Sequence, residues 1–443
     1  MRPARSILAV ASIWTAATIT AAAGGQHLPN LLAYGDSSGE VRTFSTSGAI
    51  DLNGLFFQSL GTNGRSCGTC HVPANGWTVT PEALEARFDA SDGLDPIFRT
   101  NDGSNSPIAD VSTVAARRAA YNMLLTKGLI RVGMGLPPVR DFDLVGVDDP
   151  YGYASASQLS LFRRPLPSTN LLFLSTVMWD GRESFAGESL HFDLSDQANG
   201  ATQGHAAGPA LTDAQREAIV NFETSLLTGQ AVDADAGNLD AGGGNGGPQS
   251  LAKFLGISGS TNVFAPPPFT LFSAWSNDDG QGRFGDARAS IARGEAIFNT
   301  RPITISGVNG VNDAIGQASF TGTCTTCHNT ANVGNHATPL PLDLGIASAA
   351  RRTPDMPLYT FRNRATGETI QTTDPGRALV TGFWTDMQKF KGPVLRGLAA
   401  RAPYFHNGAA ATLEDVVNFY DERFGLGLTA QEKADLIAFL RSL

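Results

Sequence analysis

The four cysteines of the chain occur as two Cys-x-x-Cys pairs, and a histidine follows each pair directly. These six residues are Cys67, Cys70, His71, Cys324, Cys327 and His328. On one helical turn, residues i and i+3 lie on the same side, and residue i+4 follows round toward them. Two cysteines so placed can form thioethers with the porphyrin vinyl groups while the imidazole reaches the iron. The pattern therefore predicts two covalently bound c-type haems.

Two disulfides or one four-cysteine zinc site are the alternative uses of the same cysteines. Disulfides occur in exported proteins, and zinc accepts four thiolates. A chain of 443 residues can bury a sizeable core without disulfides. Neither alternative requires the two adjacent histidines, so we favour haem attachment.

The N-terminus has the pattern of a secretory signal peptide over residues 1–23. Arg2 and Arg5 give a positive start, residues 6–20 are mostly apolar, and small residues end at Ala23. A membrane anchor is the alternative. No later stretch is long and apolar enough to span a bilayer. We expect cleavage after Ala23, a periplasmic location and no membrane span after signal removal.

The charge of the chain argues against two classes of partner. The net charge is -9, and loss of Arg2 and Arg5 with the signal peptide would make it -11. An acidic surface disfavours nucleic acid and anionic lipid. The hydrophobic content of 42%, with 49 Gly and 24 Pro, is that of a globular protein with many loops.

The two haem motifs stand in similar surroundings. Residues 50–77 and 293–328 each contain an apolar segment, expected to be a short amphipathic helix, that leads into the motif. This is a weak internal duplication of a cytochrome c unit. We expect a mainly α fold of two cytochrome-c-like domains, each with one haem c and long irregular loops. The domains would span residues 24–285 and 286–443.

Three further helix starts carry capping boxes, at Thr212, Thr412 and Thr429. Strand signals are sparse. The Gly-, Ala- and Asp-rich stretch 231–249 has low complexity and predicts a mobile loop in the first domain.

Three blocks accompany the motifs: "NSP" at 105–107, "MWDGRES" at 178–184 and "FKGPVLRGLAARAPYFHNG" at 390–408. With them the chain resembles the bacterial di-haem cytochrome c peroxidase family, which includes the MauG enzymes. The resemblance implies hydrogen peroxide chemistry at the N-terminal haem and electron transfer through the C-terminal haem. Electrons would come from a small donor protein or from a specific protein or organic substrate.

The resemblance also implies roles for individual residues. Trp179 matches a tryptophan that lies between the two haems. Asn105, with the backbone carbonyls of Arg401 and Pro403, matches a calcium site, and calcium takes oxygen ligands. A core aromatic and a turn residue are the plain alternatives for Trp179 and Asn105.

The second axial ligands would separate the chemistry of the haems. Family members often place a methionine fourteen residues after the histidine of "YFH". Here that histidine is His406, which we expect to support the haem, and Tyr420 stands at the methionine position. Tyr420 shares a helical face with apolar residues, so it is either an iron ligand or a core tyrosine. The segment 88–107, where peroxidases carry a histidine for the N-terminal haem, has none, which predicts an open iron face there.

An open haem face needs an acid–base group. The family uses a glutamate after "WDGR"; aligned with it, the chain keeps Gln197, but the glutamate position falls near Ala207. His205 is the nearest titratable residue and is our candidate, with a surface loop histidine as the alternative. His191 and His336 are weaker candidates. We expect a peroxidase or a MauG-like oxidase; the alternative is a di-haem electron carrier without peroxide chemistry.

Overall fold

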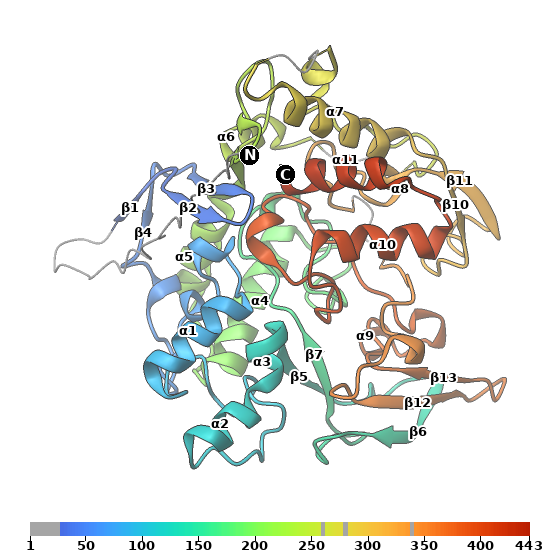
Figure 1. Ribbon diagram of the computed structural model, residues 1–443. Coiled ribbons are helices and arrows are strands. Elements are labelled where there is room, and N and C mark those ends of the chain that lie inside the picture. Colours follow the sequence, from blue (N-terminus) through green and yellow to red (C-terminus); the bar gives the residue numbers. More distant parts are fainter. Residues whose placement is uncertain (1–26, 258–261, 278–281, 337–340) are drawn as a thin grey trace, which may run out of the picture.

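The computed structural model describes residues 27–257, 262–277, 282–336 and 341–443 (Figure 1). The predicted signal peptide lies outside the described residues. The α-helices are α1 Pro81–Ser91, α2 Val114–Ala120, α3 Asn122–Lys127, α4 Leu190–His205, α5 Asp213–Thr224, α6 Pro248–Leu251, α7 Gly285–Thr300, α8 Cys324–Cys327, α9 Ala378–Thr381, α10 Leu413–Phe424 and α11 Ala430–Arg441. None of the helices in these ranges combines the length and apolar character that crossing a bilayer needs.

The strands form small antiparallel sheets. They are β1 His27–Pro29, β2 Ala33–Asp36, β3 Gly39–Ser45, β4 Ala49–Asp51, β5 Ile130–Met134, β6 Phe142–Asp148, β7 Leu159–Arg163, β8 Leu226–Asp233, β9 Gly237–Asn238, β10 Ile303–Ser306, β11 Ser319–Gly322, β12 Leu358–Asn363 and β13 Thr369–Thr372. The largest sheet has the order β2-β3-β8-β9. The expectation of a mainly α fold is therefore not confirmed, because strands accompany the helices throughout.

The helices start where their caps predict. Thr212, Thr412 and Thr429 each accept a hydrogen bond from the backbone N–H three residues on, and the residue there bonds back. Before the first haem motif, however, the predicted amphipathic helix is only a 3₁₀ turn, Leu55–Phe57. Before the second motif, α7 is a full helix.

The stretch 231–249, predicted as a loop, is mostly turns and irregular backbone between regular elements. This stretch contains the end of β8, the short strand β9 and the start of α6. Ala236 and Leu239 are completely buried. The glycines allow close approach: a Cβ on Gly246 would lie 2.5 Å from the Cβ of Leu239. These two apolar residues attach the segment to the core.

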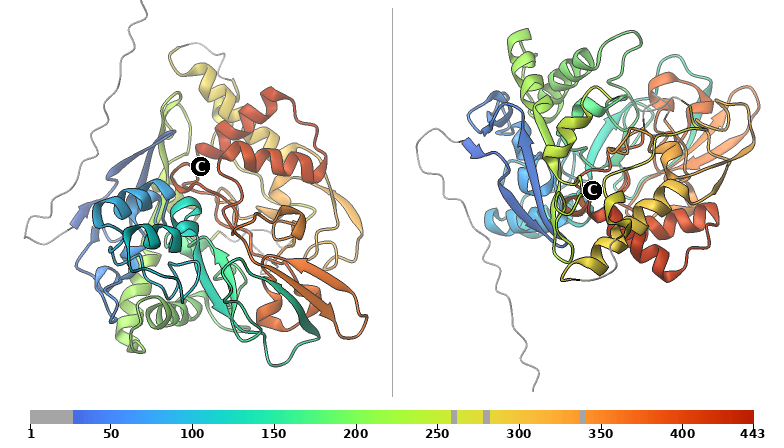
Figure 2. Two further views of the ribbon diagram at one scale, coloured as in Figure 1. Left: turned by 60° about the horizontal axis from the view of Figure 1, so that its bottom comes forward. Right: turned by 90° about the horizontal axis from the view of Figure 1, so that it is seen from above.

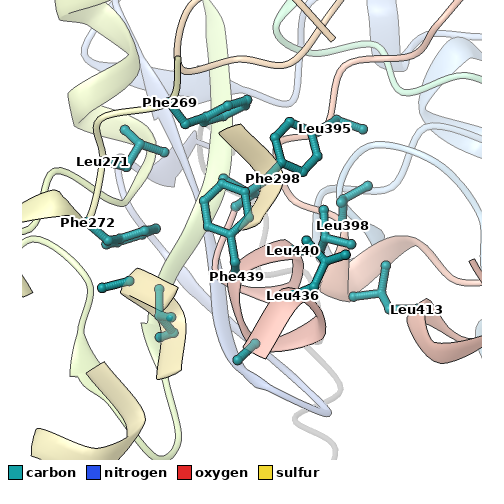
Figure 3. Close-up of a cluster of buried hydrophobic side chains, with 14 of the residues drawn as sticks. Phe269, Leu271, Phe272, Phe298, Leu395, Leu398, Leu413, Leu436, Phe439 and Leu440 are labelled. Atoms are coloured by element: carbon teal, nitrogen blue, oxygen red, sulfur yellow. The ribbon is translucent and has the colours of Figure 1, made fainter. Parts of the chain in front are cut away.

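The core of the C-terminal half lies between α7, α11 and the segment 269–275 (Figure 3). Phe269, Phe298 and Phe439 meet there, with ring centroids 5.3–5.5 Å apart. Aromatic pairs at these separations add to the stabilisation from burial alone. This core supports the wall of the cavity that holds the second Cys-x-x-Cys-His motif.

Segments from the two halves of the chain share one sheet. Strand β12 pairs with β13 on one side and with β6 on the other, so residues 142–148 lie beside residues 358–363. Figure 1 shows this sheet at the lower right, and Figure 2 shows the same neighbours from other sides. A domain boundary near residue 285 stays a prediction, and the shared sheet ties the two sides of it together.

Gly294 permits the contact between α7 and α11. A Cβ there would lie 2.0 Å from the carbonyl oxygen of Asp435 and 2.7 Å from the Cβ of Phe439. Alanine is the better helix former by about 1 kcal/mol, but overpacking costs about 1–3 kcal/mol. We expect Gly294→Ala to lower the free energy of unfolding, measured by thermal or denaturant melts. Gly200 of α4 is exposed, and a Cβ added there would have only Glu183 within 4 Å. Gly200→Ala should therefore raise the free energy of unfolding. A Gly294→Ala protein with the wild-type free energy of unfolding would show that α7 and α11 can move apart without cost.

Candidate haem sites

The first motif forms a single tight turn with its histidine held by the backbone. A 3₁₀ turn covers Cys67–Thr69, and its start is capped by reciprocal bonds between Ser66 and Thr69. The His71 N–H donates to the Cys67 carbonyl at 3.0 Å. The Nδ1–H of His71 donates to the Trp77 carbonyl at 3.0 Å. The Nε2 lone pair is thereby left for a metal.

The second motif repeats this arrangement. Thr323 and Thr326 cap α8 in the same reciprocal way. The His328 N–H donates to the Cys324 carbonyl at 3.1 Å. The Nδ1–H of His328 donates to the Gly334 carbonyl at 2.8 Å, six residues on, as in the first motif. The two turns are thus equivalent local structures, as the weak duplication in the sequence predicts.

The protonation of both motifs suits haem attachment. Burial lowers the pKa of His71 and of His328 to about 4, so both imidazoles are neutral at physiological pH. Burial raises the pKa of Cys67, Cys324 and Cys327 to about 12. Neutral thiols beside a neutral imidazole fit thioether formation and iron ligation.

Each motif lies on the wall of its own cavity. Cys67, Cys70 and His71 line one cavity of about 1550 Å³, counting the open space at its mouth. The second motif lines another of about 1500 Å³. All four cysteines are free. Because the two pairs face different cavities, they do not form a four-cysteine zinc site, and no cluster of three or more His, Cys, Asp or Glu suited to a metal occurs among the described residues.

Trp179 stands between the two cavities and lines both. It is 9% exposed. Its indole Nε1–H donates to the Arg164 carbonyl at 2.8 Å. Its ring meets that of His406 edge-on at 6.2 Å, and His406 stacks on Phe390 at 3.9 Å. Lys391 also lines both cavities. Trp179 therefore separates the two cavities, and its position between two haems stays a prediction.

Tyr420 and His406 both line the second cavity, with Cys324 and His328. Burial, and then the neighbouring cysteines, raise the pKa of Tyr420 above its usual value. A neutral phenol therefore stands here until a metal ion lowers its pKa. Burial lowers the pKa of His406 to about 4, and its Nε2 has no hydrogen-bond partner among the described residues. A neutral imidazole is thus available at the cavity wall.

Gln197 and His205 lie along α4, which forms one wall of the first cavity. The Nδ1 of His205 forms a short hydrogen bond with Asp102, which also pairs with Arg65. The imidazole is 40% exposed, whereas Asp102 is buried. Burial would raise the pKa of Asp102, but the hydrogen bond and charge of His205 and Arg65 together hold it below its usual value. The carboxylate thereby fixes the orientation of His205.

Sequence reasoning missed a carboxyl group in the same cavity. Glu223 of α5 lines it, and its Oε2 is buried without a hydrogen-bond partner. Burial raises the pKa of Glu223 to about 8. Ile219, one helical turn earlier, is apolar and buried. Glu223 therefore stands on an apolar helical face, and an acidic residue on such a face was the sequence signal that could have identified it.

The weaker histidine candidates lie elsewhere. His191 is exposed and pairs with Glu217 at 2.8 Å, so it is a surface residue. His336 is buried, 4% exposed, and lines neither cavity.

Two of the groups expected to bind calcium, Asn105 and the Arg401 carbonyl, have hydrogen-bond partners within the protein. Asn105 Oδ1 accepts from the Met123 N–H near the start of α3. The Arg401 carbonyl accepts from the Arg164 guanidinium, which also reaches the carbonyls at the other end of α3. Asn105 and the Arg401 carbonyl are thus engaged at opposite ends of this helix.

Comparison with known proteins gives partial matches. No protein-family model matches the chain. Cytochrome-c peroxidase IdrP2 of Denitromonas iodatirespirans is 34% identical over 141 residues, which are 29% of this chain and 38% of that protein. Cytochrome-c peroxidase IdrP2 of Pseudomonas sp. (strain SCT) is 31% identical over 200 residues, 40% of this chain and 53% of that protein. The chain thus spans from about a third to about half of the length of these relatives.

Among solved structures, a MauG-like protein associated with microbial copper homeostasis matches with a TM-score of 0.40 and 16% identity, over 88% of this chain and 85% of that one. The resemblance expected from the haem motifs and their accompanying blocks is confirmed by the sequence matches: parts of the chain are similar to bacterial cytochrome c peroxidases.

Proposed function

We propose that this protein is an exported di-haem peroxidase in which the first cavity reacts with hydrogen peroxide and the second receives electrons. One observation carries the proposal: two equivalent Cys-x-x-Cys-His turns line two separate cavities, and Trp179 lines both cavities. The cytochrome-c peroxidase names of the sequence relatives support it. Each haem c would supply the redox chemistry, held by the thioethers of its cysteine pair and by His71 or His328.

Residues of the first cavity would transfer the proton of the peroxide. In this proposal, His205 takes the proton from peroxide and returns it to the leaving oxygen. Asp102 and Arg65 hold His205 in place, and Gln197 contributes a polar group to the same wall. His71 would hold the iron there, and the segment 88–107 supplies no second histidine for it.

Residues between the cavities would carry electrons from the second site to the first. Trp179 borders both sites and offers an aromatic route from one to the other. Lys391 also borders both, and its ammonium donates to the Thr176 carbonyl at 2.9 Å. Burial lowers the pKa of Lys391 to about 7. A carboxylate, such as a haem propionate, placed beside it would restore the charged form.

A peroxide titration tests the proposal and separates its two forms. Peroxide is added to the oxidised protein while the haem absorption is followed, with and without a reduced small cytochrome c. Rapid oxidation of the donor means a cytochrome c peroxidase. A long-lived spectral change that is the same with and without the reduced cytochrome c means MauG-like oxidation of a specific substrate. Unchanged haem bands in both experiments would contradict the proposal and leave an electron carrier.

We expect Tyr420→Phe to change the absorption spectrum of the second haem only, because Tyr420 is proposed to bind its iron together with His328. Tyr420→Met should raise the reduction potential of that haem, since a neutral sulfur stabilises oxidised iron less than an anionic oxygen. Tyr404 is the matched control. It lines the same cavity, but its hydroxyl already donates to the Leu398 carbonyl at 3.0 Å. If Tyr404→Phe and Tyr420→Phe both retain the wild-type spectrum, Tyr420 is a core residue.

A further inference from the structure

Arg164 lies at the centre of a group of backbone carbonyls. Its Nη1 donates to the Lys127 and Gly128 carbonyls, both at 3.3 Å. Its Nη2 faces three more carbonyl oxygens, which belong to Val79 at 2.8 Å, Arg401 at 3.1 Å and Ala402 at 3.5 Å. We call these five oxygens the carbonyl cage. They come from three separate segments of the chain, so one guanidinium joins parts of both halves.

The cage is built for this side chain. Gly128 has a φ of +60°, and a Cβ there would lie 2.0 Å from the Nη1 of Arg164. Only glycine therefore allows the guanidinium to come this close. Arg164 is 4% exposed. No carboxylate pairs with it in the part of the chain that the structure describes, and burial together with the nearby Arg401 lowers the pKa of Arg164 to about 9. Carbonyl dipoles, rather than an acid, stabilise the charge.

Neutral oxygens that converge on one positive charge resemble the surroundings of a bound cation, since calcium is held by carbonyl and amide oxygens. The Arg401 carbonyl, expected to bind calcium, is in the cage. Asn105, the expected amide ligand, is not; its oxygen is bonded to Met123 at the far end of α3. The expected set of calcium ligands is thus incomplete. The Arg401 carbonyl, which belongs to that set, already accepts a hydrogen bond from the positively charged Arg164 guanidinium.

The backbone of the same residue holds the residues between the cavities. The Arg164 carbonyl accepts the indole Nε1–H of Trp179 at 2.8 Å, and the Arg164 N–H donates to the His406 carbonyl at 2.6 Å. Fixing the guanidinium in the cage therefore fixes the backbone to which both residues are bonded.

We propose that Arg164 is a built-in cation that fills the carbonyl cage in place of a bound calcium ion and so positions Trp179 between the two haem sites. The statement about the metal is independent of the proposed function, whereas the statement about electron transfer rests on it. Arg164 also lines the first cavity, but in this role it is a positioning residue, because it acts through its backbone bonds to Trp179 and His406.

The wild-type protein with both haems tests the first statement. It is dialysed against a calcium chelator, and Ca²⁺ is then added back. We expect no stoichiometric calcium by elemental analysis and no change in melting temperature at either step. Uptake of one calcium ion per chain with a rise in melting temperature would overturn the proposal. This outcome is separate from a failure of the proposed function, which would appear as missing haem or as no response to peroxide.

Variants test the second statement through the rate at which an electron equilibrates between the haems of half-reduced protein. Arg164→Gln should slow this step by about tenfold or more, since displacements near 1 Å have effects of that order or greater. Arg164→Lys should retain much of the rate, because it keeps the charge. Added Ca²⁺ should raise the melting temperature of Arg164→Gln, whose cage is open, but not that of wild type.

Arg396 is the matched control. It is 1% exposed and donates to the Asn332 and Gly247 carbonyls, so it too is a buried arginine bonded to carbonyls. Arg396→Gln should lower the melting temperature but leave the electron-transfer rate unchanged. An Arg164→Gln protein with the wild-type rate would overturn the positioning role, and so would an equal loss of rate in both glutamine variants. If Arg164→Gln does not fold, a slow Arg164→Lys protein would overturn that role.

Discussion

The Cys67→Ala/Cys70→Ala protein is expected to lose the first haem and to keep the second. Cys67 and Cys70 line one cavity, and the other cysteine pair lines another. Because each pair would form thioethers to its own haem, loss of one pair removes one covalent attachment. Denaturing mass spectrometry should show a mass lower by one haem, beyond the change in side chains. The single variants Cys67→Ala and Cys324→Ala should each impair attachment of one haem.

The mirror variant, Cys324→Ala/Cys327→Ala, is the matched control because its turn has the same local structure. It should lose the second haem and keep the first. Peroxide should then still change the spectrum of the remaining haem, while oxidation of a reduced donor should fail. A colourless wild-type protein with bound zinc would contradict the haem assignment. Loss of both haems in either double variant would contradict the independence of the two sites.

The parts of the site that local sequence encodes could be predicted. The Cys-x-x-Cys-His turns and the capping boxes at Thr212, Thr412 and Thr429 involve residues within four positions of each other, so their spacing determines their geometry. Trp179 and Tyr420 were located through resemblance and helical periodicity, and both line the cavities expected of them.

The parts that depend on distant segments could not be predicted. The pairing of β6 with β12 joins residues 210 to 221 positions apart, and no local sequence pattern predicts it. The Arg164 cage draws its oxygens from three segments. Calcium was assigned to Asn105 because a motif gives a residue's neighbours in sequence, whereas the ligand set depends on neighbours in space. The same limit hid the position of Glu223 in the first cavity.

The first cavity thus holds two groups that could exchange a proton with peroxide, His205 and Glu223. His205 is held by Asp102, which stays ionised because its pKa is lowered. Glu223 differs: burial raises its pKa to about 8, so it is protonated at neutral pH. Since the unfolded group titrates near 4.5, the folded protein binds the extra proton between about 4.5 and 8. Glu223 should therefore make stability fall as pH rises through this window, and Glu223→Gln should remove that dependence.

We expect His205→Ala to slow the reaction with peroxide by about 10²–10⁴, the usual contribution of a general acid–base group, while both haems stay bound. His205→Glu should restore part of the rate, because a carboxylate can relay the same proton. His191→Ala, which removes an exposed histidine outside both cavities, should react at the wild-type rate. The rate is measured by stopped-flow absorption of the oxidised protein mixed with peroxide. A His205→Ala protein as fast as wild type, beside a slow Glu223→Gln protein, would transfer the acid–base role to Glu223, because the group that carries the proton is the one whose loss slows the step.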